Sequence, residues 1–414
     1  MSIRRRPGGA AAAAIVPAAL ILALLAPGSA TAAPGAHAPD YPTWADVQNA
    51  KRNQAATEAE INRIEGLLVA LENQAVQLGK VAQLKAEQYA QARDALAAAT
   101  QKVQRLSDRA DQAQARADES AARAAHLIAQ LARTGGGDLT LGLLIGSASD
   151  TDQLLSRLGT MNRLTESSTD ILTRARFDQK LALSLTDDAK VAEKIRSGLA
   201  DDAQTALAAA QAASDKAEAQ VAAQEKHANQ MYAQLATLKN TTAEVEKNYQ
   251  EGLTEQQEQE QNNPPAPPVS TPPSGVDPTP DPPVGSSVSQ AIAYAKAQLG
   301  EAYGFGGAGP SRWDCSGLTK MSYASAGVYI GTHSVNNQYQ TMKAQGRLVP
   351  VGAIKAGDLL FYSGGGSTAN GSMYHVTLYV GGGQMIEAPR PGVSVRIVSV
   401  RYGDLVPYAG RPTG

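Results

Sequence analysis

The sequence predicts two kinds of fold in one chain: a long all-α antiparallel coiled-coil hairpin, followed by a small α+β domain. Three observations support this division. Small apolar residues repeat at heptad spacing within residues 33–260, prolines crowd residues 261–287, and residues 288–414 combine helical spacing with strand-like alternation. Since proline at this density supplies few backbone donors for helix or sheet, residues 261–287 are expected to form an extended linker.

Residues 1–32 are expected to be a secretory signal peptide. Three arginines at positions 4–6 precede an apolar stretch at residues 10–25, and Ala30-Thr31-Ala32 fits the small-x-small cleavage rule. The apolar stretch is shorter than the ~20 residues of a membrane-spanning helix and contains Pro17, which favours removal over anchoring. We therefore expect the protein to be secreted, into the cell wall or a periplasm-like space.

The charge of the chain excludes one class of partner. The formal net charge is −2, and no basic run follows the predicted signal peptide. Neither a nucleic-acid footprint nor a polybasic membrane patch is therefore expected.

The hairpin is predicted from two heptad patterns. The first is written from Ile61, keeps its phase as far as Leu131 and has two exceptions, Lys85 and Ser120; it predicts a long helix from Trp44 to Arg133. Its a positions are Ile61, Leu68, Ala75, Ala82, Tyr89, Leu96, Val103, Ala110, Ala117, Ala124 and Leu131. Its d positions are Ile64, Leu71, Leu78, Lys85, Ala92, Ala99, Leu106, Ala113, Ser120 and Leu127.

A turn is expected near residues 134–164, at the far tip of the hairpin. Three glycines at positions 135–137 end the first helix, and Ser149 or Asp150 can cap the next one. The second heptad pattern comprises Leu207, Ala210, Ala217, Val221, Ala228, Met231, Leu235, Leu238 and Val245. Because alanine buries little area, this seam is expected to be close but weak per repeat, which suits a lever or a passive spacer equally.

Cys315 is the only cysteine of the 414 residues. In an exported protein a lone cysteine either links chains or remains a free thiol with a use. Helical spacing follows it until Gly327, with Asp314 at the expected cap, so Cys315 is predicted at a helix N-terminus. The partial positive charge there is expected to lower the pKa of the thiol.

A cysteine nucleophile needs a base, and His375 is the favoured candidate. It opens an alternating strand, and a glycine turn at residues 381–383 joins this strand to a second one that carries Glu387. Strands joined in this way are hairpin neighbours, so Glu387 is expected to orient the imidazole. His333 is interpreted as a polar loop residue and Asp358 as a turn residue.

Three blocks of the last domain carry a family resemblance. They are "YGFGGAGPSRWDCSGLTKMSYASAGV", "KAGDLLFY" and "YHVTLYVGGGQMIEAP". In order and spacing they resemble the NlpC-type cysteine peptidases of bacterial cell walls, which have a reduced papain-like α+β fold. The resemblance implies Cys315 as nucleophile, His375 as base and Glu387 as the third residue. That third place is more often His, Asn or Gln, and an acidic residue resembles the actinobacterial, Rip-like members.

The resemblance also implies substrate and reaction. It implies hydrolysis of peptidoglycan stem peptides between D-isoglutamate and meso-diaminopimelate, with Tyr303, Asp314 and Ser316 as candidate substrate-binding residues. No metal or other cofactor is expected. The hairpin resembles those of division-associated hydrolases that dock on the FtsEX membrane complex, which implies a regulatory role. Two alternatives stay open: a wall-binding scaffold or activator without catalysis, and cleavage of the amide at the sugar–peptide junction.

Overall fold

The computed structural model describes residues 41–133, 151–262, 285–369 and 371–413. The predicted signal peptide, the glycines at the tip with the caps Ser149 and Asp150, and most of the proline-rich stretch lie outside these residues. Within the described ranges, no helix is long and apolar enough to cross a membrane.

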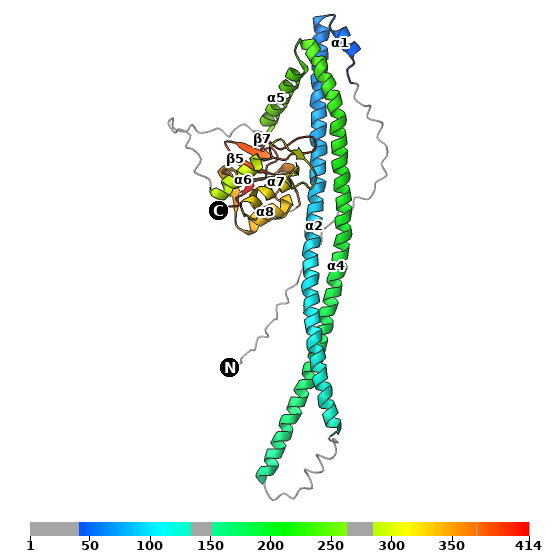
Figure 1. Ribbon diagram of the computed structural model, residues 1–414, viewed down its shortest axis with the longest axis vertical. Helices are drawn as coiled ribbons and strands as arrows, with labels where there is room; N and C mark the ends of the chain where they lie inside the picture. Colours follow the sequence, from blue (N-terminus) through cyan, green and yellow to red (C-terminus); the bar gives the residue numbers. More distant parts are fainter. Residues whose placement is uncertain (1–40, 134–150, 263–284, 370, 414) are drawn as a thin grey trace, which may run out of the picture. The chain divides into compact units, whose positions relative to one another are not determined.

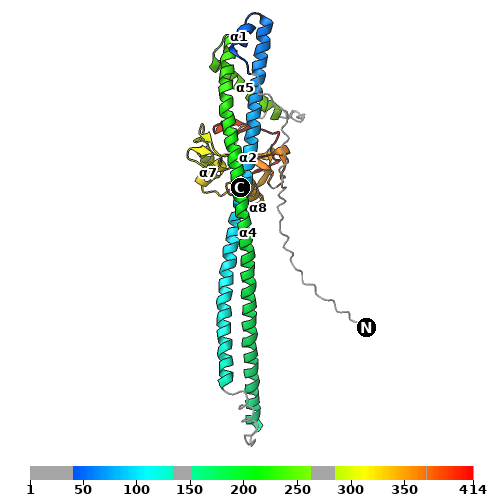
Figure 2. The ribbon, with the colours of Figure 1, turned by 90° about the vertical axis from the view of Figure 1, so that its right-hand side faces the viewer.

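Two very long helices form an antiparallel hairpin, as the sequence predicts. The helical part comprises α1 (Trp44–Ala50), α2 (Gln54–Arg133), α4 (Thr151–Lys239) and α5 (Ala243–Asn262). Side chains of α2 and α4 bond in reverse order along the chain: Lys239 to Glu65, Gln224 to Gln74, and Ser120 to Asp178. Figures 1 and 2 show the two helices side by side from two directions.

The predicted heptad of α2 is confirmed by burial. Every a and d residue from Ile61 to Leu127 is buried or half-buried, including both exceptions to the apolar pattern. Small residues allow the helices to approach closely: Ala110, Ala113 and Ala117 of α2 form one cluster with Ala182 and Leu185 of α4.

Two details of the predicted helices are wrong. The first helix is broken by a turn at residues 51–53, because the side chain of Asn53 accepts a hydrogen bond from the Ala56 amide (2.8 Å) and starts α2 there. At the other end, Asn240 has φ +63° and separates α4 from α5. Val245, predicted in the second seam, therefore lies in α5 and is 53% exposed.

The C-terminal part is a small α+β domain around a six-stranded sheet. Its helices are α6 (Ser286–Lys296), α7 (Cys315–Ser325) and α8 (Val335–Ala344), with short 3₁₀ turns η1 (Val351–Ala353) and η2 (Gly364–Gly366). The sheet order is β3-β8-β4-β5-β6-β7, with antiparallel neighbours. Its strands are β3 (Leu348–Pro350), β4 (Leu359–Ser363), β5 (Met373–Gly381), β6 (Gln384–Glu387), β7 (Arg396–Ser399) and β8 (Tyr408–Gly410). A separate parallel pair is made by β1 (Ala302–Tyr303) and β2 (Arg312–Trp313).

The central strand β5 shows the predicted alternation. Val376 and Leu378 belong to the main core, together with Leu318 of α7, whereas Tyr379 packs against a second apolar cluster. Tyr374 also belongs to that second cluster, because a register shift against β4 interrupts the alternation before His375. The β5 side chains of the main core therefore point towards α7, and those of the second cluster point away from it. The predicted fold class, a long helical hairpin followed by a papain-like α+β domain, is confirmed.

Candidate active site

Cys315 is the first residue of α7, as predicted. Asp314 caps the helix by accepting hydrogen bonds from the Gly317 amide (2.7 Å) and the Ser316 hydroxyl (3.2 Å). Gly317 is required by space, because a Cβ there would lie 2.0 Å from the carbonyl oxygen of Gly307. The cap and this close approach fix the position of the thiol.

The expected lowering of the Cys315 pKa does not occur in this structure. Burial raises the pKa of the thiol well above its usual value, and the charge of Asp314 adds to this. Backbone hydrogen bonds from Val376 and Ser316 act in the opposite direction but are outweighed. The helix N-terminus alone predicted a thiolate, whereas a buried sulfur with 5% exposure loses the hydration that stabilises its charge.

His375 and Glu387 form a buried pair on neighbouring strands. The Nε2 atom of His375 lies 2.9 Å from Oε2 of Glu387, and the two side chains are 1% and 0% exposed. Burial lowers the pKa of His375, which Glu387 partly opposes. Because the carboxylate only accepts, Nε2 carries the proton and Nδ1 keeps its lone pair. An imidazole in this state is able to accept a proton at Nδ1.

The thiol lies beside the strand that carries this histidine. The backbone N–H that bonds Cys315 belongs to Val376, the residue that follows His375 on β5. A cavity of about 320 Å³ opens over the thiol and is lined by all three predicted substrate-binding residues: Tyr303, Asp314 and Ser316. The structure therefore brings the predicted site residues to one region of the domain.

His333 is a site residue whose role sequence reasoning missed. It lies in the predicted loop, but its Nε2 atom is 2.7 and 2.8 Å from the two carboxylate oxygens of Asp314, and it lines the same cavity. The two residues are 19 positions apart on different elements, so spacing gave no signal. Asp358, by contrast, is a turn residue as interpreted: it bonds the Lys355 amide and pairs with Arg411.

Helix α2 reaches into this site, which the sequence did not predict. The side-chain nitrogen of Gln83 lies 3.0 Å from Nδ1 of His375 and also donates to the carbonyl oxygen of Pro389. Its amide therefore donates to the lone pair that a base needs. Gln83 itself is 5% exposed.

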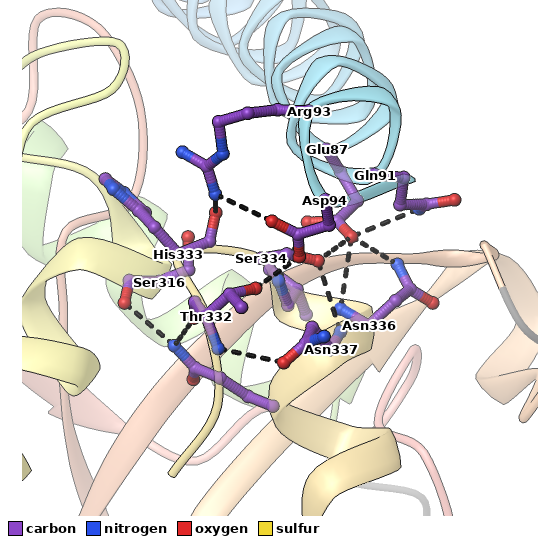
Figure 3. Close-up of polar contacts among 12 residues, drawn as sticks. Glu87, Gln91, Arg93, Asp94, Ser316, Thr332, His333, Ser334, Asn336 and Asn337 are labelled. Atoms are coloured by element: carbon purple, nitrogen blue, oxygen red, sulfur yellow. Dashed lines mark hydrogen bonds and ion pairs between the residues drawn. The ribbon is translucent and has the colours of Figure 1, made fainter. Parts of the chain in front are cut away.

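The side chain of Glu87, one turn further along α2, binds the N-terminus of α8. Its carboxylate accepts from the Ser334 hydroxyl (2.7 Å), the amides of Val335 (2.8 Å) and Asn336 (3.1 Å), and the Asn336 side chain (2.8 Å). Figure 3 shows Glu87 pointing from α2 to these donors. These four donors, the side-chain nitrogen of Gln91 (3.1 Å) and the positive end of a helix stabilise this carboxylate, while burial raises its pKa.

Further contacts continue along the same face of α2. Arg93 donates to the carbonyl oxygen of His333 (3.0 Å), Asp94 accepts from Thr332, and Glu72 pairs with Arg390. The stem of Arg390 passes so close to Gly79 that a Cβ there would lie 2.7 Å from it. A glycine inside a long helix was the one sequence signal of this approach, since it costs ~1 kcal/mol relative to alanine.

A thiol at a helix N-terminus, beside a histidine held by a buried carboxylate, defines a site of the cysteine-peptidase class. In the described part of the chain, no three His, Cys, Asp or Glu side chains gather as a metal site. Comparison with known proteins identifies the family: residues 300–405 match the NlpC/P60 family. The C-terminal part of the chain is therefore an NlpC/P60 domain, which confirms the resemblance seen in the sequence.

Named relatives share this domain. Peptidoglycan endopeptidase RipA of Mycobacterium tuberculosis is 37% identical over 133 residues, which are 29% of this chain and 26% of RipA. RipB of the same species is 37% identical over 138 residues, 30% of this chain and 53% of RipB. The crystal structure of the NlpC/p60 domain of peptidoglycan hydrolase SagA is 36% identical, with a TM-score of 0.26, over 30% of this chain and 97% of that one. The chain thus spans about a quarter to half of the length of RipA and RipB.

Proposed function

We propose that this protein is an exported peptidoglycan hydrolase that cuts stem peptides between D-isoglutamate and meso-diaminopimelate. Relatives named as peptidoglycan endopeptidases support a cell-wall hydrolase. The observation that carries the proposal is the arrangement of Cys315 against β5, next to a His375 that is bonded to Glu387. Cys315 is the nucleophile, His375 the base and Glu387 the residue that orients it.

The geometry supports one order of steps. His375 takes the thiol proton of Cys315 at Nδ1, and the sulfur attacks the peptide carbonyl. Backbone N–H groups at the start of α7 stabilise the oxyanion. The imidazolium then protonates the leaving amine, and the neutral imidazole activates the water that releases the acyl group. Glu387 holds the ring throughout, since it occupies Nε2 and leaves Nδ1 as the nitrogen that accepts the proton.

Tyr303, Asp314 and Ser316 are the proposed substrate contacts. All three line the cavity over the thiol. Asp314 presents a negative charge to a free ammonium group of a stem peptide, and His333 holds that carboxylate in place through both oxygens. Burial raises the pKa of Tyr303 well above its usual value, so its hydroxyl stays protonated and able to donate.

The hairpin is proposed to hold the enzyme in a closed state. Gln83 donates to the nitrogen that must accept the thiol proton, and Glu87 fills the N-terminus of α8 beside the cavity. A peptide cannot enter and be activated while these side chains are in place. We propose that a membrane complex of the FtsEX type releases α2 during cell division or wall remodelling.

The nucleophile is tested with purified stem peptide and the mature chain carrying Gly79→Leu, which separates α2 from Arg390. We expect cleavage by this variant and a loss of about a thousandfold or more when Cys315→Ala is added. The masses of the fragments identify the bond and show whether the new amine belongs to a peptide or to a sugar–peptide junction. Binding without any cleavage would instead support the scaffold alternative.

A further inference from the structure

Glu387 has two charged partners besides His375. Arg401 donates to Oε2 of Glu387 at 2.8 Å, the same oxygen that lies 2.9 Å from His375. Arg396 donates to the other oxygen, Oε1, at 3.0 Å. The guanidinium of Arg401 also lies over the ring of Tyr362, 4.5 Å from its centroid, which fixes its position. The imidazole and one arginine therefore share a single carboxylate oxygen.

The charges around the carboxylate of Glu387 do not cancel. One carboxylate faces two guanidiniums, and the carboxylate is 0% exposed while the side chains of Arg401 and Arg396 are 20% and 32% exposed. Charges in such a buried group are weakly screened by solvent. With His375 neutral, the group formed by Glu387, Arg396 and Arg401 carries a net charge of about +1, as follows from the unit charge of each side chain.

The other titratable neighbours are few and can be named. Asp404 accepts from Tyr374 and lies 3.5 Å from Lys80 of α2, and it opposes Arg401 in its effect on the pKa of His375. Tyr362 is held in its neutral form, because burial raises its pKa beyond the usual range. Cys315 is neutral for the same reason. Arg401 is thus the nearest charge that offsets Glu387.

We propose that Arg401 is a positioning residue that makes Glu387 act on His375 as a nearly neutral hydrogen-bond acceptor. This inference rests on the proposed function. An unpaired carboxylate would favour the imidazolium, which cannot take a proton from the thiol. The guanidinium on the shared oxygen removes that preference and keeps the oxygen aimed at Nε2. The neutral His, Asn or Gln that is more common at this place in the family needs no such partner.

A charge-balanced pair of substitutions tests this. Arg401→Gln removes one positive charge, Glu387→Gln removes one negative charge, and the double variant restores the original net charge. The pKa of His375 is measured by NMR in the full mature chain with ¹³C-labelled histidine, with His375→Gln to assign its signal. For charges separated by about 7 Å at an effective dielectric constant of about 20, we expect Arg401→Gln to raise this pKa by about 1.7 units.

Glu387→Gln and the double variant complete the double-mutant cycle. Glu387→Gln is expected to lower the pKa of His375 by more than Arg401→Gln raises it, because the carboxylate lies closer to the ring, and the double variant is expected to lie between Glu387→Gln and the original chain. An unchanged pKa in Arg401→Gln, or a double variant that departs further from the original value, overturns the inference. Arg411→Gln is the matched control, since it removes an arginine from Asp358 elsewhere in the domain.

Two further measurements separate this inference from misfolding and from the proposed function. If Arg401→Gln does not fold, the inference is tested with the double variant and with Arg401→Lys. Arg401→Lys keeps the positive charge and is expected to leave the pKa of His375 within about 0.3 units of the original value. The titration needs no substrate. An inactive original chain would therefore refute the proposed function only, whereas normal stem-peptide cleavage with an unchanged titration in Arg401→Gln would refute this inference only.

Discussion

Helix α2 has two buried faces, and they are built on different principles. The face towards α4 is a seam of alanine and leucine at heptad positions, such as Ala75, Ala82 and Ala110. The face towards the peptidase domain carries a second stripe: Gly79, Gln83, Glu87 and Ala90. The seam is stabilised by apolar contact along its length, whereas the stripe is stabilised by a few hydrogen bonds and one close approach.

Because the two faces are separate, the stability of the hairpin is expected to be independent of the closure of the active site by α2. Removing an apolar group from the seam weakens the helix pair but leaves the stripe's partners in the peptidase domain unchanged. Changing one residue of the stripe leaves the helix pair intact and weakens closure. Three substitutions and one pH series test this separation, from the largest expected effect on turnover to the smallest.

The largest effect is expected from Gly79→Leu. The new side chain collides with the stem of Arg390, where even a Cβ would be 2.7 Å away. Turnover of stem peptide should rise about ten- to a hundredfold, as expected when an open state populated at about 1–10% becomes dominant. Gly66→Leu on the same helix is the control, because nothing lies within 4 Å of its Cβ. Equal turnover in both variants would refute a closed state held by this face.

A smaller rise is expected from Glu87→Gln. The amide keeps the shape but places an NH₂ donor where a carboxylate oxygen accepts hydrogen bonds from the donors at α8. A loss of about 1 kcal/mol from the free energy that favours the closed state should raise turnover about fivefold. Glu119→Gln, at an exposed position that bonds Arg123, should have no effect. A change of the same size in both would show that the effect does not arise at the site.

The same carboxylate predicts a pH dependence of closure. Burial raises the pKa of Glu87 in the closed state above the usual value of 4.5. The closed state therefore binds a proton more tightly than the open one, so the contribution of this proton to closure is complete below about pH 4.5 and is lost as the pH rises through the raised value. The turnover ratio of the original chain to Glu87→Gln should rise about several-fold across this window. A flat or falling ratio would contradict the prediction.

The smallest effect on turnover is expected from Leu185→Ala. Leu185 packs in the seam with Ala110, Ala113 and Ala117, far along α2 from Gln83. Its truncation should destabilise the hairpin by about 2 kcal/mol, seen as an earlier loss of helical circular dichroism on heating. Turnover should stay within about twofold of the original, since distant sites act independently. Strong activation would mean that closure depends on the whole seam.

Sequence reasoning predicted what is periodic or local. The first heptad identified the seam of α2 because a buried helix face repeats every 3.5 residues, and Asp314 identified the start of α7 because a cap lies next to its helix. The His375–Glu387 hydrogen bond followed from a tight turn between two strands. Each of these features depends on residues close together in the chain or on one repeating pattern.

Features that depend on distant surfaces were not predicted. Gln83 and Glu87 look like ordinary polar residues of a solvent-facing helix, and their partners lie about 250 to 300 positions away, which no periodicity encodes. The raised pKa of Cys315 was missed for a related reason, because burial is a property of the assembled domain. Val245 shows the limit of periodicity itself, since a single left-handed residue, Asn240, ends the helix before it.

In the proposed closed state, the inhibiting helix and the site it blocks belong to one polypeptide. Gln83 and His375 meet as parts of the same molecule, so closure is a first-order process whose extent is independent of protein concentration. Dilution cannot relieve it. A peptide bond cut between α5 and α6 would turn the same contact into a bimolecular one, which then dissociates at low concentration. If the proposed closure holds, cleavage of the connecting segment would therefore be a second route to activation, additional to displacement of the helix.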